Sequence, residues 1–327
     1  MELYITTNGT NISKEKESFS IVNNDEKHLL SSEKIEAIIL EAECRISSGS
    51  IRLAVEKNIP IIISDKYGNI VGQFFGIKDV KSGKIRKAQY NIFSKSLGIE
   101  IGKNLIIDKI ISQRNHLEEL LKRRRIDLKP VEIFNIYLEK IKEISIEEKD
   151  VKNRLMGIEG VVSRLYYNEI SKLLAEKWKF KTREHINAKE PYNIVLNYLY
   201  GILYRKLETI IIKEGLDPTI GIIHSEGNKK LPFLYDFIEK YRFLAFELAF
   251  DLFNKKIIKE SFFENEKLTV EGKRIISNHF REILTETQRY KSKNFKREDI
   301  IRLELKNIKK IILEGAYELS SFIWYSR

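Results

Sequence analysis

The chain has 327 residues and a formal net charge of +11 at pH 7, with 58 Lys and Arg against 47 Asp and Glu. Hydrophobic residues make up 43% of it, which excludes a disordered polycation and is typical of a packed globular protein. A single cysteine, Cys44, excludes a disulfide framework and a cysteine-rich zinc site. No apolar run approaches the ~18 residues of a membrane span, and the N-terminus lacks a signal-peptide pattern. We therefore expect a cytoplasmic protein with no membrane segment.

Short β-rich runs separated by turn signals fill the first 76 residues, namely 3–6, 19–22, 38–40, 59–63 and 70–75. The last two flank residues 65–69, a short loop that contains Gly68, so we expect them to form a hairpin. Residues 50–57 are expected to form a short helix on this sheet. Residues 1–76 are thus predicted to be a β-rich domain.

A polar stretch with two glycines, residues 77–88, is expected to be a linker. From residue 89 onward, apolar residues recur every three or four positions, which is the period of an amphipathic helix. The predicted fold class is therefore α+β, with a small β-rich N-terminal domain followed by a larger all-helical domain over residues 89–327.

Charge also divides at the predicted linker. Residues 1–76 carry 8 Lys and Arg against 11 Asp and Glu, a net charge of −3, which leaves +14 for residues 77–327. Such an excess could serve a polyanion such as nucleic acid, because each neutralised phosphate releases counterions. The alternative is an ordinary solvated surface.

One carboxylate lies within an apolar helical stripe. In the helix that begins near residue 153, Glu159 has apolar residues four positions before it and three after it, on the same face. A buried carboxylate is costly unless it is paired or bound to a metal. Gly157 and Gly160 would let another backbone or a ligand come close. The structural alternative is an ion pair with Arg154 or Arg164.

Three further polar residues follow later in the chain. His224 ends an apolar run and precedes a polar loop, where a lone histidine is more often structural. Pro232 starts a helix in which Asp236 and Glu239 stand three apart, so both carboxylates project from one side. Taken alone, this spacing usually marks a solvated helix face.

The order of these segments changes that interpretation. Together they resemble the family of CRISPR-associated adaptation integrases known as Cas one, over essentially the whole chain. The family signatures match, in order, residues 157–160 with Arg164 and Tyr167; Asn193 with 197–204; 215–218 with Gly221 and His224; and Asp236, Glu239 and Arg242.

The resemblance implies a metal-dependent catalytic site. It assigns Glu159, His224 and Glu239 as catalytic metal ligands and Asp236 as an auxiliary acid that holds a second ion or orients a ligand. Two carboxylates and one imidazole suit Mg²⁺ or Mn²⁺. The implied reaction is attack of the 3′-hydroxyl of a captured DNA fragment on the repeat boundary of a CRISPR array, with DNA cleavage when water replaces that hydroxyl.

The resemblance also implies partners. These are double-stranded and branched DNA, a second copy of the chain bound through the N-terminal domain, and the small protein Cas two. The cations nearest the acids are candidate phosphate contacts, namely Arg164, Lys229, Lys230 and Arg242, although Arg242 could instead pair with Glu239. The basic run 122–125 is interpreted as a solvated face, and Tyr198, Tyr200 and Tyr204 as core packing.

Two other functions are compatible with the same residues. One is a non-catalytic DNA-binding scaffold whose acids form salt bridges with its lysines. The other is a structure-specific repair nuclease, which shares the metal site and differs in its substrate.

Overall fold

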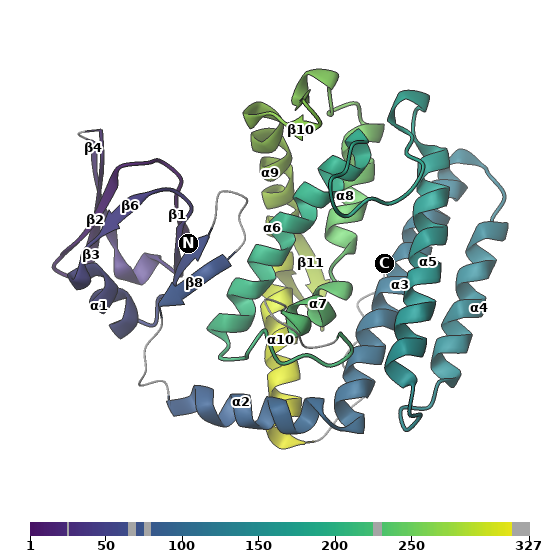
Figure 1. Cartoon of the computed structure of the whole chain (residues 1–327), viewed down its shortest axis with the longest axis horizontal. Helices are drawn as coiled ribbons and strands as arrows, with labels where there is room; N and C mark the ends of the chain where they lie inside the picture. Colours follow the sequence, from purple (N-terminus) through teal and green to yellow (C-terminus); the bar gives the residue numbers. More distant parts are fainter. Residues whose placement is uncertain (25, 65–69, 75–79, 225–230, 316–327) are drawn as a thin grey trace. The chain divides into compact units, whose positions relative to one another are not determined.

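The computed structural model describes residues 1–24, 26–64, 70–74, 80–224 and 231–315. The chain divides into two compact units, Met1–Gly83 and Lys84–Arg327 (Figure 1). The first unit is built mainly of strands and the second mainly of helices, so the predicted α+β class is confirmed. No helix in the described part of the chain is long and apolar enough to cross a lipid bilayer.

The N-terminal unit contains two four-stranded sheets. Strands β1, β5 and β7 of the first sheet run parallel, and β8 runs antiparallel to β7. In spatial order the sheet consists of β1 (Glu2–Ile5), β5 (Ala37–Leu40), β7 (Ile61–Ser64) and β8 (Ile70–Phe74). The second sheet consists of β4 (Glu26–Ser31), β3 (Ser18–Asn23), β2 (Thr10–Glu15) and β6 (Cys44–Ile46).

The predicted strands and the predicted hairpin of this unit are present. The hairpin is β7–β8, although its loop, residues 65–69, lies outside the described residues. The expected helix is α1 (Ser48–Glu56), which begins where the Ser47 hydroxyl accepts a hydrogen bond from the backbone N–H of Ser50. Strands β2, β4 and β6 were not predicted, because β2 and β4 each have several exposed polar or charged residues and β6 is only three residues long.

The second unit is a bundle of long helices. Helix α3 packs against α4, α5, α7 and α8, and α6 packs against α7, α8 and α9 (Figure 1). The helices are α2 (Val80–Phe93), α3 (Ser96–Arg124), α4 (Lys129–Glu143), α5 (Val151–Leu173), α6 (Pro191–Lys213), α7 (Pro232–Glu239), α8 (Phe243–Asn254), α9 (Val270–Thr285) and α10 (Arg297–Glu314). From Val80 onward, the stretch expected to be a linker is helical.

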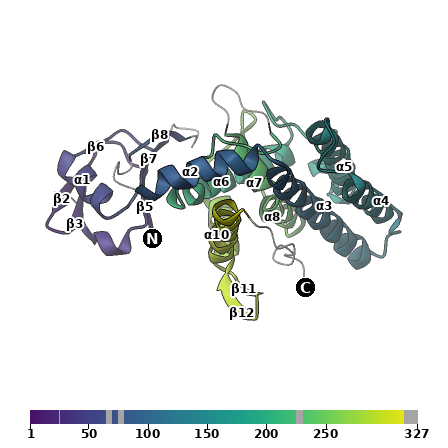
Figure 2. The same ribbon diagram turned by 90° about the horizontal axis from the view of Figure 1, so that it is seen from below.

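Short 3₁₀ helices and two small hairpins complete the part of the chain that the structure describes. The 3₁₀ helices are η1 (Ser32–Lys34), η2 (Glu176–Trp178) and η3 (Glu260–Phe262). The hairpins are β9 (Phe263–Glu264) with β10 (Lys267–Leu268), and β11 (Thr287–Tyr290) with β12 (Lys293–Lys296), which lies at one end of α10 (Figure 2). The expectation of an all-helical domain was wrong for these segments, whose strands are too short or too polar to show an apolar alternation.

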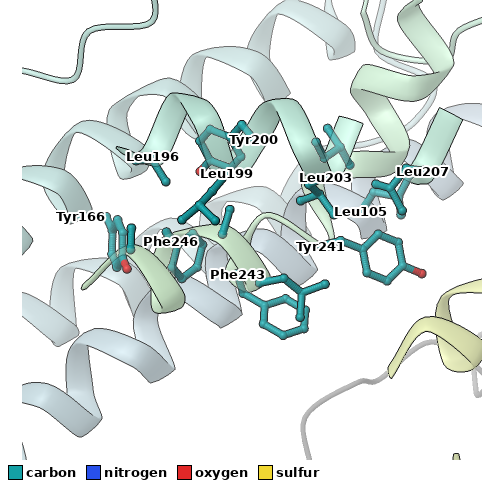
Figure 3. Close-up of a cluster of buried hydrophobic side chains, with 14 of the residues drawn as sticks. Leu105, Tyr166, Leu196, Leu199, Tyr200, Leu203, Leu207, Tyr241, Phe243 and Phe246 are labelled. Atoms are coloured by element: carbon teal, nitrogen blue, oxygen red, sulfur yellow. The ribbon is translucent and has the colours of Figure 1, made fainter. Parts of the chain in front are cut away.

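Aromatic and aliphatic side chains from several helices form the core of the bundle. Figure 3 shows part of it, where Leu105 of α3, Tyr166 of α5, Leu199 of α6 and Phe246 of α8 are all buried. The rings of Tyr166 and Phe246 lie 4.9 Å apart. This packing fixes α5 and α7, the helices that carry the predicted acids, against α3.

Two ion pairs join α3 to the end of α7. Lys109 of α3 lies 2.6 Å from Glu239, and Lys240 lies 3.1 Å from Asp108, so each helix contributes one cation and one anion. Lys240 also contacts Glu304 of α10 at 3.0 Å. All four groups that join α3 and α7 are largely or fully buried.

Candidate active site

Two of the predicted acids meet at one buried cation. The Lys109 ammonium lies between Glu159 of α5 and Glu239 of α7, 2.6 Å from Glu239 Oε2 and in contact with Glu159 Oε1. The Lys109 and Glu239 side chains are only 6% and 5% exposed, while Glu159 is 24% exposed. The Ser163 hydroxyl donates a further hydrogen bond to Glu159 Oε1 at 2.8 Å.

The pairing controls the charge state of both partners. Burial raises the pKa of Glu239, but the charges of Arg242 and Lys109 outweigh burial and lower this pKa to about 2. Burial lowers the pKa of Lys109, but Glu239 and Glu159 hold it above its ordinary value. Glu239 is therefore a carboxylate and Lys109 an ammonium at neutral pH.

Arg242 holds the other oxygen of Glu239. Its Nε donates to Glu239 Oε1 at 2.8 Å, and its guanidinium also donates to the Tyr204 hydroxyl at 3.1 Å. The guanidinium carbon lies 4.9 Å from the centre of the Tyr200 ring, a cation–π distance. Of the two alternatives for Arg242, the structure contains the pairing with Glu239.

His224 is oriented by Asp236. The Asp236 carboxylate accepts hydrogen bonds from the backbone N–H groups of Ile222, Ile223 and His224, and lies 2.7 Å from His224 Nδ1. A carboxylate at Nδ1 favours the tautomer that carries its proton there, which leaves Nε2 as the nitrogen able to coordinate a metal. Burial lowers the pKa of His224, but the hydrogen bond and charge of Asp236 outweigh burial and raise it above its ordinary value.

Two glycines allow the segment that carries His224 to lie so close to its neighbours. A Cβ atom on Gly102 of α3 would lie 2.5 Å from Ile223 Cγ1. A Cβ atom on Gly221 would lie 2.4 Å from Pro232 Cβ and 3.1 Å from the carbonyl oxygen of His224. Neither position accommodates a side chain unless these neighbours move.

The surface of α5 is open at Gly157 and Gly160, the two glycines that flank Glu159 in the sequence. In the part of the chain that the structure describes, apart from the helix's own backbone, no atom lies within 4 Å of a Cβ built on Gly157 or Gly160. The close approach of another backbone, one of the two alternatives for these glycines, therefore does not occur among the described residues. The other alternative, an approaching ligand, has room.

The donor set fits a hard divalent cation. Glu159 and Glu239 already share one cationic partner, Lys109. The buried Oε2 atom of Glu239 is in ion contact with Lys109 but accepts no hydrogen bond from a described residue. The carboxylates are the ligands that suit Mg²⁺ or Mn²⁺, and the Nε2 of His224 would add a nitrogen donor. As arranged, however, no three His, Cys, Asp or Glu side chains among the described residues converge on one point.

Sequence reasoning missed three residues near these acids. The first is Lys109. Its position among the apolar residues 105, 106 and 110 of the predicted helix could have indicated that its side chain is buried. Arg183 lies between the rings of Tyr167 and Tyr200, 5.8 and 5.7 Å from their centres. His185 is the third, and its pKa is lowered to about 4 by burial and by the nearby charges of Arg183, Arg242 and Lys109.

Other predicted contacts lie apart from the acids or outside the described residues. Arg164 is exposed, and its five-residue spacing places it about 140° around α5 from Glu159. Arg154 pairs with Glu148 rather than with Glu159. Lys229 and Lys230 lie outside the described residues.

The structure agrees with a solvated face for Lys122 and Arg123 and with packing roles for Tyr198 and Tyr200. Lys122 and Arg123 are exposed and pair with glutamates one turn earlier on α3, as expected of a solvated face. Tyr200 is buried and its hydroxyl lies 2.7 Å from that of Tyr167. Tyr198 is partly buried and bonds to Ser277 at 2.8 Å.

One protein family and its members match most of the chain. The family described as "CRISPR associated protein Cas1" matches residues 3–289. The CRISPR-associated endonuclease Cas1 1 of Archaeoglobus fulgidus is 26% identical over 298 residues, which cover 84% of this chain and 86% of that protein.

Two solved structures share the fold. A casposase bound to integration product is 21% identical with a TM-score of 0.70, and the match covers 97% of both chains. A Cas6-RT-Cas1–Cas2 complex is 20% identical with a TM-score of 0.77, and the match covers 96% of this chain and 35% of that one.

Proposed function

The chain belongs to the Cas1 family of CRISPR-associated proteins, and from this membership we propose that it is a metal-dependent DNA integrase and endonuclease of CRISPR adaptation. The observation that carries the proposal is the meeting of Glu159 and Glu239 at one cation, beside a histidine whose Nδ1 is held by Asp236. The name of the A. fulgidus relative, an endonuclease, supports the nuclease activity. The casposase, bound to its integration product, supports strand transfer.

In the proposed reaction, the 3′-oxygen of a captured DNA fragment forms a new bond to a phosphorus atom of the target. The bond from that phosphorus to the target's own 3′-oxygen breaks, which leaves a 3′-hydroxyl. Water in place of the attacking hydroxyl gives cleavage. A bound Mg²⁺ or Mn²⁺ ion would polarise the phosphate oxygens and stabilise the attacking and leaving oxygens.

The residues of the chain have separate tasks in this reaction. Glu159, Glu239 and the Nε2 of His224 would hold the ion. Asp236 accepts the hydrogen bond of the Nδ1–H group, so that Nε2 is the nitrogen without a proton in the neutral ring, and this makes Asp236 a positioning residue. Arg242 fixes the orientation of Glu239 through Oε1 and keeps this acid ionised.

The partners are part of the proposal. DNA would contact Arg164, which is exposed, and Lys229 and Lys230, which lie outside the described residues. The solved complex that contains Cas1 and Cas2 supports Cas2 as a partner. We propose that the homodimer forms through the N-terminal unit, whose edge strands β1 and β8 are available for pairing. These strands expose Tyr4 and Val71, which are 48% and 66% accessible to solvent.

The scaffold alternative is supported by one observation of its own. It predicts salt bridges between the acids and lysines, and Glu159 and Glu239 do pair with Lys109. The two functions are separated by a substitution that removes a metal ligand and leaves the cationic surface unchanged.

That substitution is His224→Ala. On the integrase proposal it nearly abolishes Mn²⁺-dependent strand transfer and cleavage of branched DNA but leaves DNA affinity almost unchanged, because the salt dependence of binding comes from Lys and Arg. His279→Ala is the matched control, since this histidine lies on α9 and pairs only with Glu282 among the described residues. We expect it to retain full activity.

A reciprocal variant tests binding. Replacing Lys229 and Lys230 with Ala should weaken binding across all sequences and reduce the salt slope by up to about two if both contact phosphates. If His224→Ala retained full metal-dependent turnover with purified, nuclease-free protein, the active site would be wrong and the scaffold function would be favoured.

A further inference from the structure

The cation between the two acids belongs to the protein itself. The Lys109 ammonium contacts one oxygen of Glu159 and one of Glu239 at the point where the proposed function places a divalent ion. We propose that Lys109 is a built-in counter-cation that occupies the metal position in the metal-free protein and leaves it when a divalent ion binds. This inference rests on the proposed function, and it assigns Lys109 as the residue that controls metal affinity.

The two acids require such a cation. Glu239 is buried, and Glu159 shares its ammonium, so two negative charges converge where water is scarce. Without a cation between them, the two like charges would repel each other strongly in this buried site. Of the two acids, Arg242 pairs with Glu239 alone among the described residues, through the other carboxylate oxygen, Oε1. Lys109 is therefore the one cation, among the described residues, that contacts both acids.

The ammonium and a divalent ion compete for the same oxygens. Lys109 Nζ lies 2.6 Å from Glu239 Oε2, and Mg²⁺ or Mn²⁺ would approach that oxygen to about 2.0–2.3 Å. Two cations on the same lone pairs would lie within a few ångströms of each other in a buried site and repel strongly. Binding of the ion thus requires the flexible side chain of Lys109 to withdraw.

The exchange changes the charge of the site. With Lys109 and Arg242 opposite Glu159 and Glu239, the four side chains are together neutral. A divalent ion makes the same site doubly positive, and Lys109 remains tethered to α3 beside it. An anionic phosphodiester can compensate that charge, so metal binding should strengthen phosphate binding at this site, and the reverse.

Calorimetric titration of the full-length protein with Mn²⁺ tests the exchange. Lys109→Met removes the competing charge at similar length, and we expect Mn²⁺ to bind at least ten times more tightly than to wild type, which corresponds to about 1.4 kcal/mol. Lys240→Met is the matched control, because Lys240 is an equally buried lysine that pairs with Asp108 and Glu304 instead. It should change Mn²⁺ affinity less than twofold. Equal or weaker Mn²⁺ binding by Lys109→Met would overturn the proposal.

A second measurement needs no variant and covers the case in which Lys109→Met does not fold. Reductive methylation of wild-type lysines, followed by mass spectrometry, reports how accessible each ammonium is. Lys109 should be protected in EDTA and react several times faster in saturating Mn²⁺, while Lys240 stays protected in both. Unchanged protection of Lys109 in Mn²⁺ would refute the displacement.

Glu239→Gln distinguishes failure of this inference from failure of the proposed function. If Mn²⁺ bound equally well to wild type and to this variant, the metal centre would be wrong and the role of Lys109 with it. If Mn²⁺ binding required Glu239 but was no tighter in Lys109→Met, only the role of Lys109 would be wrong.

Discussion

Asp236→Asn should disable the candidate site through the histidine rather than through a metal ligand. The Asp236 carboxylate is 1% exposed and accepts three backbone N–H groups as well as the His224 ring. An amide offers one acceptor oxygen and turns an NH₂ group toward the remaining donors. Its NH₂ group can donate to His224 Nδ1 only if the ring proton moves to Nε2, and this tautomer cannot coordinate a metal through Nε2.

The expected loss of stability in Asp236→Asn follows from the contacts of the Asp236 carboxylate. Whichever way the amide is turned, one or two buried N–H groups lose their acceptor, at about 1–3 kcal/mol each. We therefore expect a loss of about 3 kcal/mol in the free energy of unfolding, which lowers Tm by roughly 6–12 °C for a unit of this size. Mn²⁺ affinity should fall at least tenfold.

Thermal denaturation in EDTA and calorimetric Mn²⁺ titration measure both effects. Asp217→Asn is the control, because Asp217 also accepts a backbone N–H, that of Thr219 at 2.9 Å, but in an exposed turn. It should cost less than about 1 kcal/mol. The reasoning is refuted if Asp236→Asn unfolds within 2 °C of wild type, or if Asp217→Asn loses as much.

Three further outcomes are expected. Burial raises the pKa of Glu208 from its ordinary value of 4.5 to about 7, so the folded state loses stability as the pH rises from about 4.5 to about 7. Glu208→Gln should therefore stabilise by up to about 3 kcal/mol at pH 8 and little at pH 5, whereas exposed Glu264→Gln should show no such difference in denaturant titrations. Gly102→Ala, whose methyl group would lie 2.5 Å from a side-chain carbon, should cost about 1–3 kcal/mol, while Gly201→Ala, with open space in a helix interior, should stabilise by up to about 1 kcal/mol in the same thermal melts. Deleting residues 1–76 should give a monomer or an aggregate; a clean dimer in sedimentation would contradict the proposed interface.

The sequence predicted the fold class and the family because these depend on periodicity and on the order of short motifs. The helix period distinguishes the two units, and the four signatures place Glu159, His224 and Glu239 in one family site. The role of Asp236 was only partly predictable, since its spacing from Glu239 indicates a shared helix face but not the backbone of residues 222–224 folded around its carboxylate.

Lys109 shows where sequence reasoning reached its limit. A lysine in a long helix with many charged residues is usually solvated, and only tertiary packing brings its ammonium to acids 50 and 130 positions later in the chain. The strands β11 and β12 were missed for a related reason. Their residues are largely charged or polar, and their pairing depends on a local turn rather than on a buried apolar face.

The paired charges on α3 and α7 also restrict how these two helices can pack during folding. If α7 were advanced by one residue, Lys240 would face Lys109; if it were set back by one residue, Glu239 would face Asp108. Either slip places like charges together in a buried interface, which is far more costly than a misplaced apolar contact. Ionic matching between α3 and α7 therefore favours the register that brings the acids together over these two one-residue slips.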